Sequence, residues 1–202
     1  MIAIIDYGVG NLFSLGSSLA ALGIESVVTD DENIIRNADK IILPGVGAFR
    51  DASEKLAERG FDKLLKELAA DGKPIMGICL GMQLLFERSF EYGEHRGIGL
   101  IKGDIMGFDG KIDKSLKIPQ IGWNALKLTK KDCPLWKYIK EGDYVYFVHS
   151  YFAALSDATA SSSEYGIEFT AAVSDGNVYG CQFHPEKSGD VGLNILRGFC
   201  EA

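Results

Sequence analysis

The sequence predicts an α/β protein built on a doubly wound, mostly parallel β-sheet, with an additional section of short strands. Short apolar runs, which are typical of buried strands, alternate with segments of helical periodicity. Glycines stand at the ends of several helical segments, where they are natural stops. Because ligands bind beyond the carboxyl ends of the strands in such sheets, the loop after each strand is a candidate for function.

The N-terminal part of the chain shows the alternation best. Leucines at positions 12, 15, 19 and 22 have helical spacing, and Gly23 ends that helix. A second helical pattern runs from Asp51 to Ala70 and is broken near Gly60, and a third helix is expected over Leu80–Phe86. The strands expected between these helices are Met1–Ile5, Ser26–Thr29, Lys40–Leu43 and the apolar run of Ile75, Met76 and Ile78.

The second half is richer in strands than in helices. We expect short strands from Leu100 to Leu128, with Ile118–Asn124 in a loop. Tyr144–Phe152 is rich in aromatic and β-branched residues and therefore predicts a strand. Asn177–Phe183 predicts another strand, and apolar residues at 193, 196, 199 and 200 predict a C-terminal helix that covers the sheet.

Length and composition fit one globular domain over residues 1–202 and exclude several functional classes. Hydrophobic residues make up 47% of the chain and charged residues 24%, which is ordinary for a soluble protein. The net charge of −7 argues against nucleic-acid binding and against binding to anionic membranes. No apolar run is long enough to span a membrane, and no basic leader precedes the first strand. The four cysteines form no C-x-x-C pair, so we expect a cytoplasmic protein without disulfides or zinc.

The strongest chemical motif lies between the expected strand at 75–78 and the helix that follows it. Gly77-Ile78-Cys79-Leu80-Gly81 has the pattern of a nucleophile elbow, with sulfur in place of the serine oxygen. The glycines are needed because a sharp strand-to-helix turn leaves no room for Cβ atoms. A helix N-terminus beside the thiol favours the thiolate, which attacks carbonyl carbon. The alternative is a buried structural cysteine. The two glycines favour a nucleophile.

The second motif, His184-Pro185-Glu186, follows the expected strand at 177–183. Pro185 biases His184 toward an extended conformation, and side chains two residues apart in an extended segment point the same way. His184 and Glu186 are therefore predicted to face one pocket, with the carboxylate holding the imidazole in one tautomer. In a chain with a cysteine elbow, these two residues supply the base and the orienting group of a triad.

Other features leave alternatives open. Gly8-x-Gly10 lacks the third glycine of a dinucleotide-binding fingerprint, because Phe13 stands there; a phosphate or partner contact and a plain tight turn remain. The glycines of Pro44–Phe49 either aim an N–H at an oxyanion or form an ordinary turn. His149 either lines a site or is a hydrogen-bonded structural histidine, and a Trp on a loop, such as Trp123, usually fills the core.

Together these motifs resemble those of class I (triad-type) glutamine amidotransferases, over essentially the whole chain. Gly77–Gln83 and His184–Glu186 match the signature that many members of the class share. Further segments resemble one subfamily, the glutaminase subunits of imidazole glycerol phosphate synthase in histidine biosynthesis: Ile5–Asn11, Pro44–Phe49, Ile121–Asn124, Phe147–Tyr151 and Lys187–Ser188. The residue after Pro119 is often His in that subfamily and is Gln120 here, so no specific contact is carried over at that point.

The resemblance implies a flavodoxin-like fold, a single glutamine amidotransferase domain, and hydrolysis of L-glutamine to glutamate and ammonia through a thioester on Cys79, without a cofactor or metal. His184 would act as acid and base, oriented by Glu186. By the same resemblance, backbone N–H groups of Leu80 and of the loop that contains Val46 and Gly47 would form the oxyanion hole. The residues implied for binding glutamine are Gly45, Gln83, Glu91, His149, Ser150 and Tyr151.

The resemblance also implies a partner, a synthase subunit of (β/α)₈ fold in a heterodimer. Ammonia would pass to it and be used to make imidazole glycerol phosphate and aminoimidazole carboxamide ribotide. Residues that match the docking and gating face are Gly10, Asn11, Trp123 and Lys187. A flipped peptide in the loop Pro44–Gly47 would keep the oxyanion hole incomplete until the partner binds its ligand.

Three other functions compete with this interpretation. The nearest is an amidotransferase that serves another synthase. A cysteine hydrolase or peptidase on the same sheet is the second. A sensor or binding module without catalysis is the third, although it would not need an intact set of Cys, His and Glu.

Overall fold

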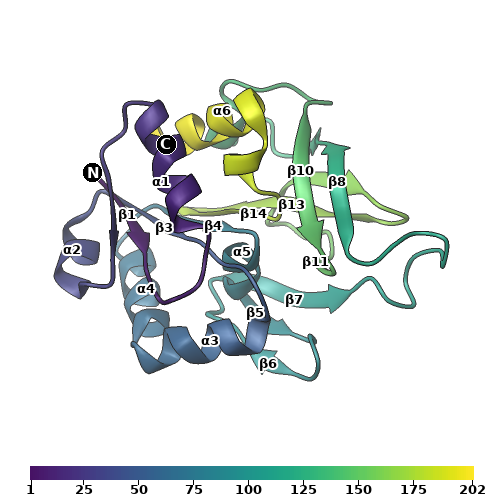
Figure 1. The fold of residues 1–202 in the computed structure, drawn as a ribbon, viewed down its shortest axis with the longest axis horizontal. Coiled ribbons are helices and arrows are strands. Elements are labelled where there is room, and N and C mark those ends of the chain that lie inside the picture. The colour runs from purple at the N-terminus through teal and green to yellow at the C-terminus, as the bar shows by residue number, and fades with distance from the viewer.

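The structure, a computed structural model, describes residues 1–202 and consists of one large sheet with helices on it and smaller sheets at one end (Figure 1). The helices are α1 (Leu12–Ala21), α2 (Glu32–Asn37), α3 (Phe49–Glu58), α4 (Phe61–Ala70), α5 (Leu80–Leu84) and α6 (Gly189–Cys200), with short 3-10 turns η1 (Pro134–Trp136) and η2 (Pro185–Lys187). None of these helices combines the length and the apolar character needed to cross a bilayer.

The strands divide into those of the large sheet and those of two small sheets. The large sheet contains β1 (Ile2–Ile5), β2 (Ser26–Thr29), β3 (Lys40–Leu43), β4 (Ile75–Ile78), β9 (Lys127–Leu128), β12 (Thr159–Glu164), β13 (Glu168–Asp175) and β14 (Val178–Cys181). The small sheets contain β5 (Phe86–Ser89), β6 (His95–Arg96), β7 (Ile101–Gly107) and β11 (Tyr151–Ala153), and the pair β8 (Gln120–Ala125) and β10 (Tyr144–His149).

The large sheet has the strand order β2-β1-β3-β4-β14-β13-β12-β9. All neighbours from β2 to β14 are parallel, and β13, β12 and β9 continue the sheet in antiparallel pairing. The predicted α/β sheet is confirmed, with an antiparallel extension. Its centre places β4 beside β14, with Ile78 opposite Cys181. The loops that follow these two strands therefore leave the same edge of the sheet at adjacent positions.

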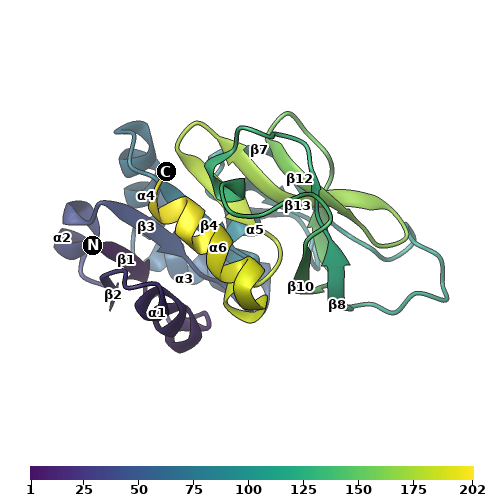
Figure 2. The ribbon, with the colours of Figure 1, turned by 90° about the horizontal axis from the view of Figure 1, so that it is seen from above.

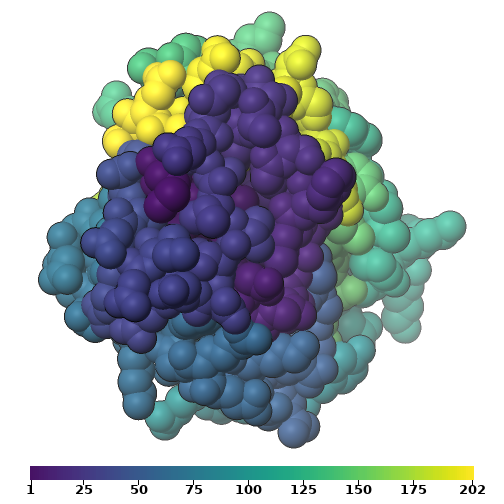
Figure 3. Space-filling model, turned by 60° about the vertical axis from the view of Figure 1, so that its left-hand side comes forward, coloured from purple at the N-terminus to yellow at the C-terminus, as the bar shows by residue number.

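Both faces of the parallel strands are buried, each against its own set of helices. Alternate strand residues such as Ile5 and Leu43 share a core with the apolar side chains of α3 and α4. Their neighbours, such as Ile4 and Ile42, share the opposite core with α1 and α6. Figure 2 shows α1 and α6 lying together on one face. In Figure 3 the C-terminal residues (yellow) border the N-terminal ones (purple) on the outer surface.

The expectation of a loop over Ile118–Asn124 is wrong, because β8 begins at Gln120. It pairs antiparallel with β10, with Ile121 opposite Val148 and Gln120 opposite His149. Pro119, Gly122 and Trp123 resemble loop residues in local composition. The strand exists because a distant segment supplies its hydrogen-bond partners, which local composition does not show.

The structure differs from the sequence expectations at other elements as well. The helix after Cys79 ends at Leu84, and Phe86 already opens β5, which pairs with β7. Helix α2 and the hairpin of β12 and β13 were not predicted. The β12 sequence Thr-Ala-Ser-Ser-Ser-Glu looks like a loop, yet Ser161 and Ser162 are completely buried between β13 and β9.

The turn between β4 and α5 depends on close backbone packing at glycines. A Cβ on Gly77 would lie 2.6 Å from the carbonyl oxygen of Gly81, and a Cβ on Gly81 would overlap the carbonyl oxygen of Leu43. These contacts hold the end of β3 against the first turn of α5. The predicted reason for the glycines, lack of space for side chains, matches this geometry.

Replacing Gly81 with Ala should destabilise the fold by at least about 3 kcal/mol, because the added methyl forces the backbones of β3 and α5 apart. Urea unfolding followed by circular dichroism measures this loss. The matched control is Gly16→Ala in the middle of α1, where no atom lies within 4 Å of the added Cβ. That change should stabilise the protein by about 0.5–1 kcal/mol. Equal stability of the two variants would contradict the steric argument.

Candidate active site

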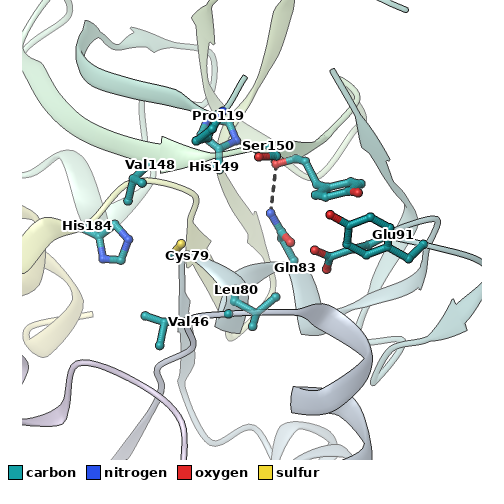
Figure 4. Close-up of a pocket in the computed structure, with 13 residues that line it drawn as sticks. Val46, Cys79, Leu80, Gln83, Glu91, Pro119, Val148, His149, Ser150 and His184 are labelled. Carbon is teal, nitrogen blue, oxygen red and sulfur yellow. Dashed lines mark hydrogen bonds between the residues drawn. The ribbon is translucent and has the colours of Figure 1, made fainter. Parts of the chain in front are cut away.

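Cys79 lies at the joint between β4 and α5 in a conformation that few non-glycine residues adopt. Its φ is 56° and its ψ is −113°, and backbone strain of this kind is concentrated at functional sites. The Cys79 N–H donates to the carbonyl oxygen of Cys181 on β14 at 2.7 Å. The turn aims the side chain into a cavity of about 330 Å³ that is also lined by His184, Val46, Leu80 and other residues (Figure 4).

His184 follows β14 and faces the same cavity. Its backbone is extended, with φ −100° and ψ 98°, as expected before Pro185. Its Nδ1 lies 2.8 Å from Oε1 of Glu186, so the ring donates to the carboxylate. The backbone N–H of His184 donates to the carbonyl oxygen of Tyr146 at 2.9 Å, which fixes the turn against β10. Figure 4 shows the imidazole beside the sulfur of Cys79.

The charge state of His184 is set by its two neighbours. Burial on its own would lower the pKa of His184. Hydrogen bonds with Cys79 and Glu186, together with the negative charges of these groups, outweigh burial and raise it to about 9. The imidazole is thus held protonated at neutral pH next to the sulfur of Cys79.

Glu186 itself is almost completely enclosed, with 2% of its side chain exposed. The side-chain amide of Asn11 donates to its Oε1 at 3.5 Å, and its Oε2 has no hydrogen-bond partner. Asn11 was expected only on a docking face. In the structure it also joins the turn after β1 to the carboxylate that orients His184.

The loop Pro44–Ala48 passes directly over the elbow. A Cβ on Gly45 would lie 2.6 Å from the backbone nitrogen of Gly81, so the loop packs against the start of α5. The N–H groups of Val46 and Gly47 donate to no acceptor in the chain. Gly47 has a φ of 90°, in the region that favours glycine. Leu80, as the first residue of α5, has an N–H without a partner inside the helix.

The end of the cavity away from His184 is formed by residues that match the expected glutamine contacts. Oε2 of Glu91 accepts the backbone N–H of Phe49 at 2.6 Å, and burial raises the pKa of the Glu91 carboxyl. The amide nitrogen of Gln83 donates to the carbonyl oxygen of Tyr151 at 3.0 Å (Figure 4). Ser150, between β10 and β11, also lines the cavity.

His149 lines the cavity, but its ring is bound on both sides by the protein. Its Nδ1 lies 2.8 Å from the carbonyl oxygen of Tyr151, and its Nε2 lies 2.9 Å from Oε1 of Gln120. Burial lowers the pKa of His149 to about 4, so the ring is neutral near pH 7. Gln120, the departure from the subfamily pattern, is fully buried and its amide also contacts Asn124 at 2.8 Å. These contacts make His149 a support for the Tyr151 backbone.

Of the residues expected on a docking face, Trp123 and Lys187 are exposed. Trp123 is 52% exposed and packs edge-on to Tyr146, so it does not fill the core. Lys187 is exposed on η2. A Cβ on Gly10 would lie 2.9 Å from the ring of Pro44, which joins the turn after β1 to the loop over the elbow.

The sequence patterns did not identify two residues that lie near the sulfur of Cys79. The hydroxyl of Tyr7 donates to the carbonyl oxygen of Pro44 at 2.8 Å and so holds the start of the loop. Gln182 is fully buried, and its side-chain nitrogen lies 3.9 Å from Sγ of Cys79. No sequence pattern around Tyr7 indicated that its side chain would contact the loop after β3. Gln182 lies two residues before His184, in a segment that the sequence predicted to be a strand, and that spacing would have suggested that both side chains face one side.

The raised pKa of His184 has a consequence for stability. The folded state holds the imidazole proton more tightly than the unfolded chain, so this group stabilises the protein fully below its ordinary pKa of 6.5. That contribution, up to about 3 kcal/mol, is lost as the pH rises from 6.5 through about 9. Urea unfolding at several pH values should show this decline, and His184→Gln should lack it. A wild-type ring that titrates below pH 6.5 by NMR would contradict the proposed charge state.

Comparisons with known proteins identify the family of the chain. The family model "Glutamine amidotransferase class-I" matches residues 3–201. The chain is 52% identical to the imidazole glycerol phosphate synthase subunit HisH of Sulfurimonas denitrificans, with 98% of this chain and 97% of the relative covered. It is 50% identical to the subunit of the same name from Caldanaerobacter subterraneus, with 100% and 98% covered.

Solved structures support the fold. A glutamine amidotransferase crystal structure has a TM-score of 0.77 at 16% identity, covering 100% of this chain and 98% of that one. The structure of PurLQS from Thermotoga maritima has a TM-score of 0.76 at 22% identity, covering 99% and 97%. From the family match and the identity to HisH subunits along the whole length, the chain belongs to the class I glutamine amidotransferases, in the family of the imidazole glycerol phosphate synthase subunit HisH.

Proposed function

We propose that this chain is the glutaminase subunit of an imidazole glycerol phosphate synthase and supplies ammonia for histidine biosynthesis. The observation that carries the proposal is the placement of Cys79 and His184 in one cavity, with His184 bonded to Glu186, in a chain half identical to HisH subunits. Residues 1–202 would act as one amidotransferase domain, without a cofactor.

In the first half of the reaction, the Cys79 thiolate attacks the side-chain amide carbon of L-glutamine. The carbonyl oxygen becomes an oxyanion, and the backbone N–H groups of Leu80 and of Val46 or Gly47 are the available donors for it. One such donor is worth roughly 100- to 1,000-fold in rate. As the C–N bond breaks, protonated His184 gives its proton to the leaving nitrogen, and ammonia departs from a thioester on Cys79.

In the second half, neutral His184 takes a proton from water as the water oxygen attacks the thioester carbon. The C–S bond then breaks, glutamate is released, and the thiolate is restored beside the imidazolium. Glu186 holds Nδ1 of His184 throughout, so that the other ring nitrogen faces the reacting atoms.

Glutamine is a zwitterion with no net charge, so its backbone groups need paired contacts. The Glu91 carboxylate lines the far end of the cavity and is suited to the substrate ammonium group. Gln83, Gly45 and the segment His149-Ser150-Tyr151 supply polar side-chain or backbone contacts around the rest of the molecule. A substrate held at both ends is positioned for attack at its amide carbon.

The partner we propose is a synthase subunit of (β/α)₈ fold, docked on the face that contains Gly10, Asn11, Trp123 and Lys187. Asn11 contacts Glu186, and Gly10 packs against Pro44, so this face touches both the triad and the loop over the elbow. A peptide flip in that loop on ligand binding to the partner would complete the oxyanion hole. The reactive thiol requires a reducing environment, which supports a cytoplasmic location.

Replacing Cys79 with Ala should abolish glutamine hydrolysis, with a loss of more than about 1,000-fold, because the nucleophile is gone. The complex with the synthase subunit should still form product from added ammonium. Glutamate release and ammonium-dependent product formation measure the two activities. His184→Ala should lose most glutaminase activity, and Glu186→Ala should lose less. Retained hydrolysis in Cys79→Ala would refute the nucleophile assignment.

Replacing Trp123 with Ala should weaken binding to the synthase subunit by about 30-fold, because exposed tryptophans often dominate interfaces. Isothermal titration calorimetry measures the affinity. The control is Leu155→Ala, which removes a side chain of similar exposure, 48%, after β11. The same affinity for Trp123→Ala as for the wild type would exclude Trp123 from the interface.

A further inference from the structure

Gln182 is a buried side chain that reaches the reacting sulfur and has no role in the triad. It directly follows β14 and is completely enclosed by the protein. Its side-chain Nε2 lies 3.9 Å from Sγ of Cys79, within hydrogen-bond range for sulfur. Its Oε1 accepts the side-chain amide of Gln83 at 2.8 Å. The amide is thus bound on one side and directed at the sulfur on the other.

The orientation of this amide follows from its neighbours. The carbonyl oxygen of Tyr151 accepts hydrogen bonds and donates none, so the Gln83 group that lies 3.0 Å from it is the NH₂. The second N–H of that NH₂ points at Gln182 and requires an oxygen there. The NH₂ of Gln182 must therefore be the group that faces the sulfur. The carbonyl group of Tyr151 thus determines, through Gln83, that the side-chain nitrogen of Gln182 faces the sulfur of Cys79.

We propose that Gln182 is a further catalytic residue of the glutaminase reaction, donating a side-chain N–H to the Cys79 sulfur and stabilising its thiolate form. The assignment rests on the proposed function. An N–H directed at a thiolate favours the charged form, and the effect is strong where water is excluded. Cys79 is 8% exposed, so few water molecules reach it.

The role of Gln182 is distinct from that of His184. His184 releases its proton to the departing nitrogen and is then neutral, whereas the amide of Gln182 keeps its N–H groups throughout the cycle. It therefore remains a donor when the C–S bond of the thioester breaks and negative charge returns to the sulfur. Gln182 supports both the resting thiolate and its expulsion as a leaving group.

The test measures the thiolate directly in the isolated chain. Gln182→Met keeps the size and removes the donor. Alkylation of Cys79 by iodoacetamide, followed by mass spectrometry of the peptide that contains it, should be about ten-fold slower than in the wild type at pH 7. The pH profile of the alkylation rate should shift upward. The matched control is Ser162→Ala, which removes another fully buried hydrogen-bond donor, one that contacts Glu168 and not sulfur; its alkylation should match the wild type.

A second variant covers the case in which Gln182→Met does not fold. Gln182→Leu is also of similar size and lacks the N–H donor, so alkylation should be slowed by about the same factor. Wild-type alkylation rates across the pH range in either folded variant would overturn the proposal, even if glutamine turnover fell. Slow alkylation in these variants, but no glutamine hydrolysis by the wild type with its synthase partner, would instead overturn the proposed function.

Discussion

The site depends on a close approach of backbones that only glycine permits. Gly77, Gly81 and Gly45 allow β4, α5 and the loop after β3 to meet with no Cβ between them. This contact holds Cys79 at a positive φ, and the strained residue directs its sulfur into the cavity. A side chain at any of these glycines would separate the nucleophile from the loop that lies over it.

The sheet brings the other half of the site to this elbow. Because β14 is inserted next to β4 and runs parallel to it, the segment after β14 leaves the sheet beside Cys79. Gln182 and His184 reach the sulfur from that segment, and β10 fixes its position through the hydrogen bond from His184 to Tyr146. The exposed Trp123 on β8 lies opposite Tyr146 on the paired strand β10. The proposed docking surface and the turn that contains His184 are therefore attached to the same two-stranded sheet.

Around the cavity, polar side chains are joined into a connected set that ends on backbone carbonyls. The oxygen of Tyr151 accepts from both His149 and Gln83, and Gln83 in turn binds Gln182. Fully paired buried networks define one arrangement, because each lost contact leaves a polar group without a partner. Oε2 of Glu186, a buried side-chain oxygen without a partner, lies next to the imidazole whose charge changes during the proposed reaction.

Local sequence features predicted the alternating strands and helices, the glycine-flanked Cys79 and the extended backbone of His184, whereas Glu186 lies in the 3-10 turn η2 and not in an extended segment. These features arise from local rules: steric space at a tight turn, the restriction before proline, and hydrophobic period. The family and its glutaminase function, expected from the motifs, are confirmed by the comparisons. The three-dimensional structure was needed to show that Gln120 begins a strand, that Ser161 is buried, and that Tyr7 and Gln182 contact the site. These features depend on contacts with residues that are distant in the chain, and local composition does not reveal such contacts.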